Sequence, residues 1–99
     1  MARILLDLNS PVFQKTWFSL DRQEALAVLA AMRKLSGMEW DALYRDKGLR
    51  WEAIVSRSGP HGLRIYSLRI TQRIRAVAYR DGDLLRLLSL HRDHDSAYG

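Results

Sequence analysis

Apolar and polar positions alternate along the last third of the chain, in three runs that cover residues 63–70, 74–80 and 84–90. A period of two is the pattern of a β-strand with one buried face. The pair Asp81-Gly82 separates the second run from the third, which is typical of a β-hairpin. Only residues 71–73 separate the first run from the second. Because short connections join adjacent antiparallel strands, the pattern predicts a meander whose middle strand pairs with both of its neighbours.

The same period of two separates the arginines of these strands from the apolar residues beside them. Arg69 is flanked by two apolar residues, and so is Arg75. Successive side chains of a strand point to opposite faces of a sheet, so the guanidinium groups lie opposite the apolar set. The pattern therefore predicts one buried face and a second face on which arginines stand together. We expect that face, or its rim, to bind the ligand.

The first half of the chain has a helical period. An apolar run over residues 2–8 predicts a short strand, and Ser10-Pro11 then resembles an N-cap followed by proline at the first helical position, which opens a helical turn over residues 11–17. Residues 20–24 form a capping box with an apolar residue ahead of it, and they predict the start of a helix over residues 22–35. Its expected buried stripe comprises Ala25, Val28, Leu29, Met32 and Leu35.

The middle of the chain completes the predicted order of elements. Residues 38–46 predict a second, shorter helix, and residues 49–57 alternate as a partly buried strand with Trp51, Ala53 and Val55 on one face. The expected order is β-α-α-β-β-β-β in a single domain over residues 1–99. Because the helices precede the meander, this is an α+β fold, with an antiparallel sheet and two helices packed on one face.

Composition narrows the class of protein. The 99 residues include no cysteine, which excludes a disulfide framework, a thiolate metal site and a cysteine nucleophile. No apolar run approaches the roughly 20 residues of a membrane span, so we expect a cytoplasmic protein. The net charge is +5, and residues 50–99 contribute +4 of it through arginine as their only cation. Arginine grips phosphate bidentately and stacks on bases, which favours nucleic acid as a ligand, although exposed strands also carry charge for solubility alone.

Three kinds of chemistry can be weighed from the residues. His91, Asp93, His94 and Asp95 could include metal ligands, but no second cluster exists elsewhere to complete a shell. No serine stands in a Gly-x-Ser-x-Gly elbow. RNA cleavage without a metal needs a base, cations on the phosphate and an acid for the leaving oxygen. Strand arginines beside a histidine or tyrosine could supply these roles, or the arginines could be surface charges that pair with neighbouring acids.

The segment from Tyr66 to Tyr98 resembles the RelE/ParE superfamily of bacterial toxin–antitoxin systems. The resemblance rests on an Arg-Ile pair at Arg69, on an Arg-x-Val-x-Tyr strand from Arg75 and on the acidic turn after it. A last strand then ends in His-Arg, with a tyrosine six residues after Arg92. The predicted order of elements agrees with the compact fold of that family over the whole chain.

The resemblance implies a set of site residues. In the nuclease branch, an arginine that opens the Arg-x-Val-x-Tyr strand, a strand-end arginine and a near-terminal tyrosine act on the scissile phosphate. In a related subgroup, the arginine of the Arg-Ile pair and a C-terminal histidine contribute. The matching residues here are Arg69, Arg75, His91 (or His94), Arg92 and Tyr98. The chain departs from the pattern because it lacks the middle-strand lysines of some nucleases, and Leu68 stands where the subgroup has a second arginine.

The expected function is that of a type II toxin, a metal-independent and ribosome-associated mRNA endonuclease that inhibits translation. The expected partners are a cognate antitoxin and mRNA on the ribosome, with no cofactor and no membrane. Two alternatives stay open at this point. One is a ParE-like inhibitor of DNA gyrase, and the other is a non-catalytic module with the RelE fold that binds RNA or protein.

Overall fold

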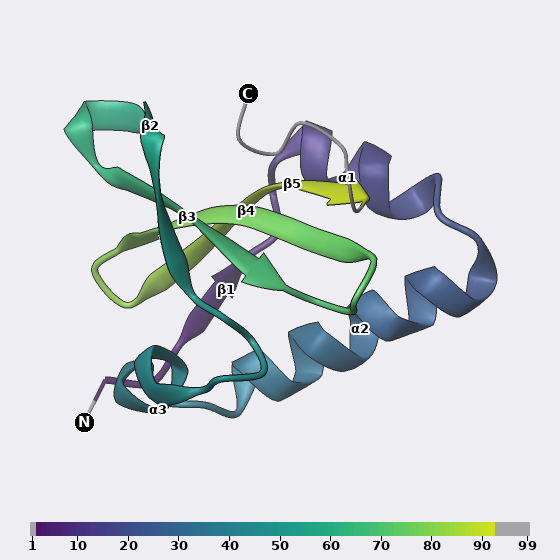
Figure 1. The fold of residues 1–99 in the computed structure, drawn as a ribbon, viewed down its shortest axis with the longest axis horizontal. Helices are drawn as coiled ribbons and strands as arrows, with labels where there is room; N and C mark the ends of the chain where they lie inside the picture. The colour runs from purple at the N-terminus through teal and green to yellow at the C-terminus, as the bar shows by residue number, and fades with distance from the viewer. Residues whose placement is uncertain (1, 93–99) are drawn as a thin grey trace.

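The computed structural model describes residues 2–92, and within this range the chain forms three helices and five strands (Figure 1). No helix in this range combines the length and apolar character that crossing a bilayer requires. The helices are α1 (Pro11–Phe18), α2 (Arg22–Ser36) and α3 (Trp40–Arg45), and the strands are β1 (Leu5–Asp7), β2 (Glu52–Ser58), β3 (Arg64–Arg69), β4 (Ile74–Asp81) and β5 (Leu84–Arg92).

The five strands form one sheet in the order β1-β5-β4-β3-β2. The predicted meander is confirmed, because β4 pairs antiparallel with both β3 and β5. Gly82 has a φ of 62° in the turn between β4 and β5, which explains the Asp-Gly pair there. The sheet is mixed rather than purely antiparallel, since β1 joins β5 in parallel, with Leu5 beside Leu84. The α+β class is confirmed, with β1 as the parallel addition.

Local sequence signals set the helix starts. The Ser10 hydroxyl accepts a hydrogen bond from the Phe13 amide at 3.3 Å, and the Asp21 carboxylate accepts one from the Glu24 amide at 2.8 Å. Both residues are therefore the N-caps that the sequence predicts. The turn expected after Pro11 is a full helix of eight residues, so three helices, not two, pack against the sheet.

The main core lies between the three helices and one face of the sheet. Helix α2 buries Val28, Met32 and Leu35 there, as the sequence predicts, together with Ala31. Leu29 was expected in the same stripe, but its side chain is 41% exposed. Each residue advances about 100° around a helix axis, so Leu29 lies a quarter turn from Val28 and reaches the edge of the buried face.

Strand β2 keeps its predicted alternation as far as Ile54, but Val55 is not buried as a residue of the inner face would be. Ile54 is buried, whereas Val55 is 96% exposed, although Val55 was expected on the same face as Trp51 and Ala53. The pairing of β2 with β3 is irregular between Ala53 and Ser58, where the hairpin extends past the helices. Ile54 packs on the opposite face of the sheet, as the alternation predicts, in a small second cluster that includes Val77.

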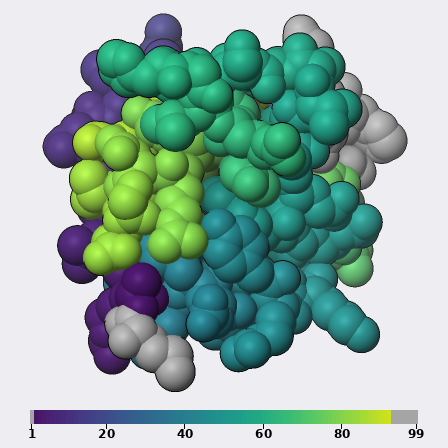
Figure 2. Space-filling view, turned by 90° about the vertical axis from the view of Figure 1, so that its left-hand side faces the viewer, coloured from purple at the N-terminus to yellow at the C-terminus, as the bar shows by residue number. Residues whose placement is uncertain are grey.

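An aromatic cluster closes the end of the molecule where α3 meets the sheet. The rings of Trp51 and Tyr66 stack with centroids 4.2 Å apart, and the guanidinium of Arg80 lies 4.3 Å from the ring centroid of Trp40. Figure 2 looks onto this end, where the β4–β5 turn (yellow-green) lies against α3 (blue), and where Trp40 Nε1 donates to the Asp83 carbonyl at 3.1 Å. Arg80 therefore has a structural role as a cation–π partner.

Candidate active site

Two arginines and a histidine form a transverse row across three adjacent strands. Arg69 of β3 is the register partner of Arg75 of β4, and Arg75 is in turn the partner of His91 of β5. Residues directly opposite each other on neighbouring strands share a face of the sheet. We call Arg69, Arg75 and His91 the Arg–Arg–His row.

This row lies on the face of the sheet that carries no helix. The residues next to it along the strands, Leu68, Ala76 and Leu90, are all buried in the main core beneath the helices. Because side chains alternate along a strand, the row points to the opposite, open face. The sequence prediction that Arg69 and Arg75 share a face is confirmed, and the same register places His91 beside them.

A β-bulge at Leu88 brings His91 to the open face. The pairing of β5 with β4 shifts between Val77 and Ala78, so that Ala78 faces Leu87 while Val77 faces Ser89. Leu87 belongs to the main core, and Leu88 packs against the small cluster on the other face. One extra residue therefore reverses the alternation, because a bulge sets two residues opposite one. Without it, the odd-numbered residues after Leu87 would continue to face the helices.

Helix α1 binds the edge of β5 at the bulge with two hydroxyl groups. The Ser10 hydroxyl donates to the Leu88 carbonyl at 3.0 Å, and the Leu90 amide donates to the Thr16 hydroxyl at 3.3 Å. These contacts satisfy backbone groups of β5 where β1 no longer reaches, since β1 pairs only with residues 84–86. The irregular part of β5 is therefore held in place from one side by α1 and from the other by β4.

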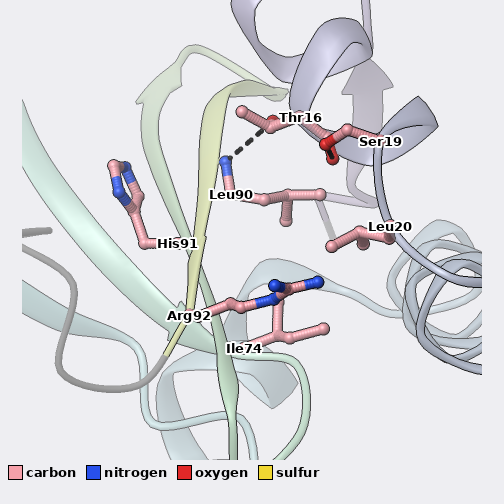
Figure 3. Close-up of a pocket in the computed structure, with 7 residues that line it drawn as sticks. All are labelled: Thr16, Ser19, Leu20, Ile74, Leu90, His91 and Arg92. Carbon is pink, nitrogen blue, oxygen red and sulfur yellow. Dashed lines mark hydrogen bonds between the residues drawn. The ribbon is translucent and has the colours of Figure 1, made fainter.

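Arg92 lies on the opposite side of β5 from His91. Figure 3 shows the two side chains pointing away from each other, with Arg92 close to Ile74. Its guanidinium donates to the Glu24 carboxylate of α2 at 2.8 Å, beside a pocket of about 220 Å³ between α1 and the end of β5. Arg92 therefore does not share the open face with Arg69 and Arg75, although the resemblance groups the three arginines at one phosphate. The extra residue at the bulge is the cause.

Two further sequence candidates, His94 and Tyr98, lie outside the described residues, as do Asp93 and Asp95. Within residues 2–92, no three His, Cys, Asp or Glu side chains come together in a way that could hold a metal ion.

The charge of the Arg–Arg–His row favours an anion. Like charges directly opposite each other on neighbouring strands repel, and Arg69 faces Arg75 in this way. The Nε atom of Arg69 is also buried without a hydrogen-bond partner among the described residues. Glu52, an acidic residue on the neighbouring strand β2, forms an ion pair with Arg50 at 3.1 Å. A phosphate group that approached the row would offset the repulsion and accept hydrogen bonds from both guanidinium groups.

Arg86 has a structural role, because its ion pairs connect neighbouring strands of the sheet. It donates to Asp81 at 3.0 Å and also to Asp7, so that one guanidinium links β4, β5 and β1. The backbone amide of Asn9 is the main cause of a lowered pKa at Asp7, and Arg86 lowers this pKa further, while burial partly opposes both. The pattern of the sequence alone did not indicate this network, because Asp7 and Arg86 are distant in the chain.

Sequence reasoning also missed Ser89 as a member of the site. Its hydroxyl lies 2.8 Å from Nε2 of His91, on the same face of β5. The spacing Ser-x-His on a strand is a usable signal, since residues two apart share a face of the sheet.

The order, pairing and layering of the elements define the RelE-like fold, and the fold predicted from the sequence is confirmed. One similar solved structure is a chain of the archaeal RelE–RelB complex from Pyrococcus horikoshii OT3, with a TM-score of 0.62 and 16% identity, covering 97% of this chain and all of that one. A second is a copper-bound mutant toxin from Helicobacter pylori, with a TM-score of 0.48 and 19% identity, covering 94% of this chain and 96% of that one. No protein-family model and no curated protein matches the chain.

Proposed function

We propose that this protein is the toxin of a type II toxin–antitoxin system and acts as a metal-independent endonuclease on mRNA at the ribosome. The observation that carries the proposal is the Arg–Arg–His row on the helix-free face of a RelE-like sheet. Two guanidinium groups and an imidazole on one face are the parts that RNA transesterification needs. All three residues are partly exposed.

In the proposed reaction, the imidazole of His91 takes the proton of the ribose 2′-hydroxyl, and the resulting oxyanion attacks the adjacent phosphorus. Arg69 and Arg75 stabilise the added negative charge of the pentavalent phosphate. The bond from phosphorus to the 5′ oxygen then breaks, and the imidazolium returns its proton to the leaving oxygen. The products are a 2′,3′-cyclic phosphate and a 5′-hydroxyl, so one histidine balances the proton transfers.

Three further residues complete the proposal taken from the sequence. Tyr98 would stack on a base or assist as a base, and His94 is the alternative to His91 in proton transfer. Arg92 would bind phosphate, but its ion pair with Glu24 lies on the other face of the sheet. A role for Arg92 therefore requires the RNA to pass around the end of β5, beside the pocket between this strand and α1.

We propose a small antitoxin as the partner that neutralises the protein. The structure from Pyrococcus horikoshii OT3 is that of a RelE–RelB complex, and it shares the fold of this chain. A neighbouring open reading frame for a small DNA-binding protein would support this assignment. Co-expression of the two genes should then yield a complex and relieve any growth arrest.

The test is tightly controlled expression of the wild type, followed by mapping of mRNA ends on translating ribosomes. The proposal predicts growth arrest with mRNA cleaved to 2′,3′-cyclic phosphate ends. Arrest with intact mRNA and gyrase-linked DNA breaks would identify a ParE-like gyrase inhibitor instead. A folded wild type that causes neither arrest nor cleavage would leave a non-catalytic binding module.

A further inference from the structure

A serine and a histidine form a close pair at one end of the Arg–Arg–His row. The hydroxyl of Ser89 lies 2.8 Å from Nε2 of His91, and both side chains are half-buried on the open face of β5. Ser89 is the register partner of Val77, two residues along the strand from the row, while His91 faces Arg75. The pair therefore lies inside the region where the proposed reaction takes place.

The fold holds this pair in place through the bulge at Leu88. The bulge sends both Ser89 and His91 to the open face, and α1 binds the residues on either side of Ser89. The Ser10 hydroxyl donates a hydrogen bond to the Leu88 carbonyl, and the Thr16 hydroxyl accepts one from the Leu90 amide. The backbone at Ser89 is thus bound on both sides, which limits the positions that its hydroxyl can reach.

A hydroxyl group suits a histidine that gains and loses a proton. When the neutral ring carries its hydrogen on Nε2, the Ser89 hydroxyl accepts a hydrogen bond from Nε2–H, and it keeps that bond after Nδ1 has taken a proton. A contact at one ring nitrogen also sets the tautomer, and thereby which atom is left for proton transfer. Among the described residues, the charged groups beside His91 on the open face are Arg75 and then Arg69, whereas Arg92 and Glu24 pair on the other face.

We propose that Ser89 is a positioning residue that holds the imidazole of His91 through Nε2, so that Nδ1 exchanges protons with the RNA. This inference rests on the proposed function, in which His91 is the group that transfers protons. It adds a residue that touches neither the phosphate nor the ribose and that acts only through the ring of His91.

The experiment compares Ser89→Ala with Ser89→Thr, which restores a hydroxyl, and with Ser36→Ala as a matched control. Ser36 is exposed on α2, and its hydroxyl donates to the Arg33 carbonyl at 2.8 Å. We expect Ser89→Ala to lower single-turnover RNA cleavage about tenfold, the size of one ordinary hydrogen bond, and to shift the pH–rate profile. Ser89→Thr should recover most of the rate, and Ser36→Ala should leave it unchanged.

A second readout is independent of cleavage. The ¹⁵N chemical shifts of the His91 ring report its tautomer and titration, and a His91→Gln variant assigns its signals among the three histidines. Loss of the Nε2 contact in Ser89→Ala should change the tautomer ratio. If Ser89→Ala alters neither the ring shifts nor the pH–rate profile, the positioning role is wrong.

The two proposals fail in distinguishable ways. A folded wild type that does not cleave RNA would remove the proposed function, while the ring shifts would still show whether Ser89 holds His91. If Ser89→Ala does not fold, Ser89→Cys in reducing buffer takes its place, because a thiol of similar size is only a weak hydrogen-bond donor and acceptor. Wild-type ring shifts and rates in that variant would equally overturn the inference.

Discussion

Arg75 occupies the centre of the Arg–Arg–His row, with Arg69 on one neighbouring strand and His91 on the other. A phosphate bound to the row would contact Arg75 whichever end it approached. The half-buried position of this side chain also limits the freedom of its guanidinium. Arg75 is therefore the residue whose loss should separate chemistry from simple attraction.

We predict that Arg75→Ala lowers the rate of RNA cleavage by about 10²–10³-fold, by analogy with the loss of one donor to a developing oxyanion. The folded structure should persist, since Arg75 lies on the open face and not in the main core. The matched control is Arg33→Ala, which removes the same charge from the exposed side of α2. Single-turnover cleavage measures the effect, and equal losses in both variants would contradict a site at the row.

The sequence could place Arg69 and Arg75 together but could not place Arg92. The first two lie in strands that alternate without interruption, so a period of two assigns their faces correctly. Arg92 follows the bulge at Leu88, and an inserted residue reverses every face after it. Leu87 and Leu88 are both leucine, so the residue types at this point do not show where the alternation breaks.

At the scale of elements, α2 provides a matched pair of leucines for testing which face is buried. Leu35 is fully buried, whereas Leu29 is 41% exposed. Leu35→Ala should cost about 2–5 kcal/mol of unfolding free energy, because it leaves a cavity in the main core. Leu29→Ala should cost at most about 1 kcal/mol, as expected for a side chain at the edge. Urea unfolding of both variants checks the prediction, and equal losses would contradict the orientation of the helix.

The ion pairs of Arg86, which connect β1, β5 and β4, predict that the stability of the protein depends on pH. The pKa of Asp7 is lowered in the folded protein, chiefly by the Asn9 amide and further by Arg86. A carboxylate with a lowered pKa contributes stability that is fully present above its unfolded pKa and is lost as the pH falls through the folded value. We therefore expect this contribution to disappear as the pH drops below the ordinary aspartate value of 3.8.

Asp7→Asn tests this dependence. The variant should be less stable than the wild type near neutral pH, and its stability should fall less steeply in acid, because the charge is already absent. Urea unfolding at about pH 7, pH 5 and pH 3 follows both effects. Asp83→Asn, at an exposed position in the β4–β5 turn, is the control. Parallel stability curves for Asp7→Asn and the wild type would contradict the linkage.

The elements that the sequence predicts correctly are those whose signals are local. The caps at Ser10 and Asp21 each bond an amide three residues away, and the turn at Gly82 depends on its own backbone. The parallel pairing of β1 was missed because β5 is distant in the chain, and the exposure of Val55 was missed because the β2–β3 hairpin extends past the helices that would cover it. Neither feature can be recognised from the residue types that surround it in the sequence.

At the scale of the whole molecule, the arginine excess of residues 50–99 predicts how RNA binding responds to salt. Each phosphate that a cation neutralises in single-stranded RNA steepens the fall of log Kobs with log salt concentration by about 0.7. Arg75→Ala should therefore reduce this slope by about 0.7, whereas Arg33→Ala should leave it unchanged. A short RNA with 2′-O-methyl groups binds without cleavage and allows the measurement. Equal slopes for all three proteins would argue against a phosphate at the row.

The parallel pairing of β1 with β5 has a consequence for the timing of synthesis. Leu5 and Leu84 are neighbours in the sheet, so β1 leaves the ribosome well before β5, the strand with which it pairs. His91 lies near the end of that last strand, and the row is incomplete without it. A nascent chain cannot assemble this site while β5 is still inside the exit tunnel. Any activity that depends on the row therefore begins only after β5 has been synthesised and has paired with β4.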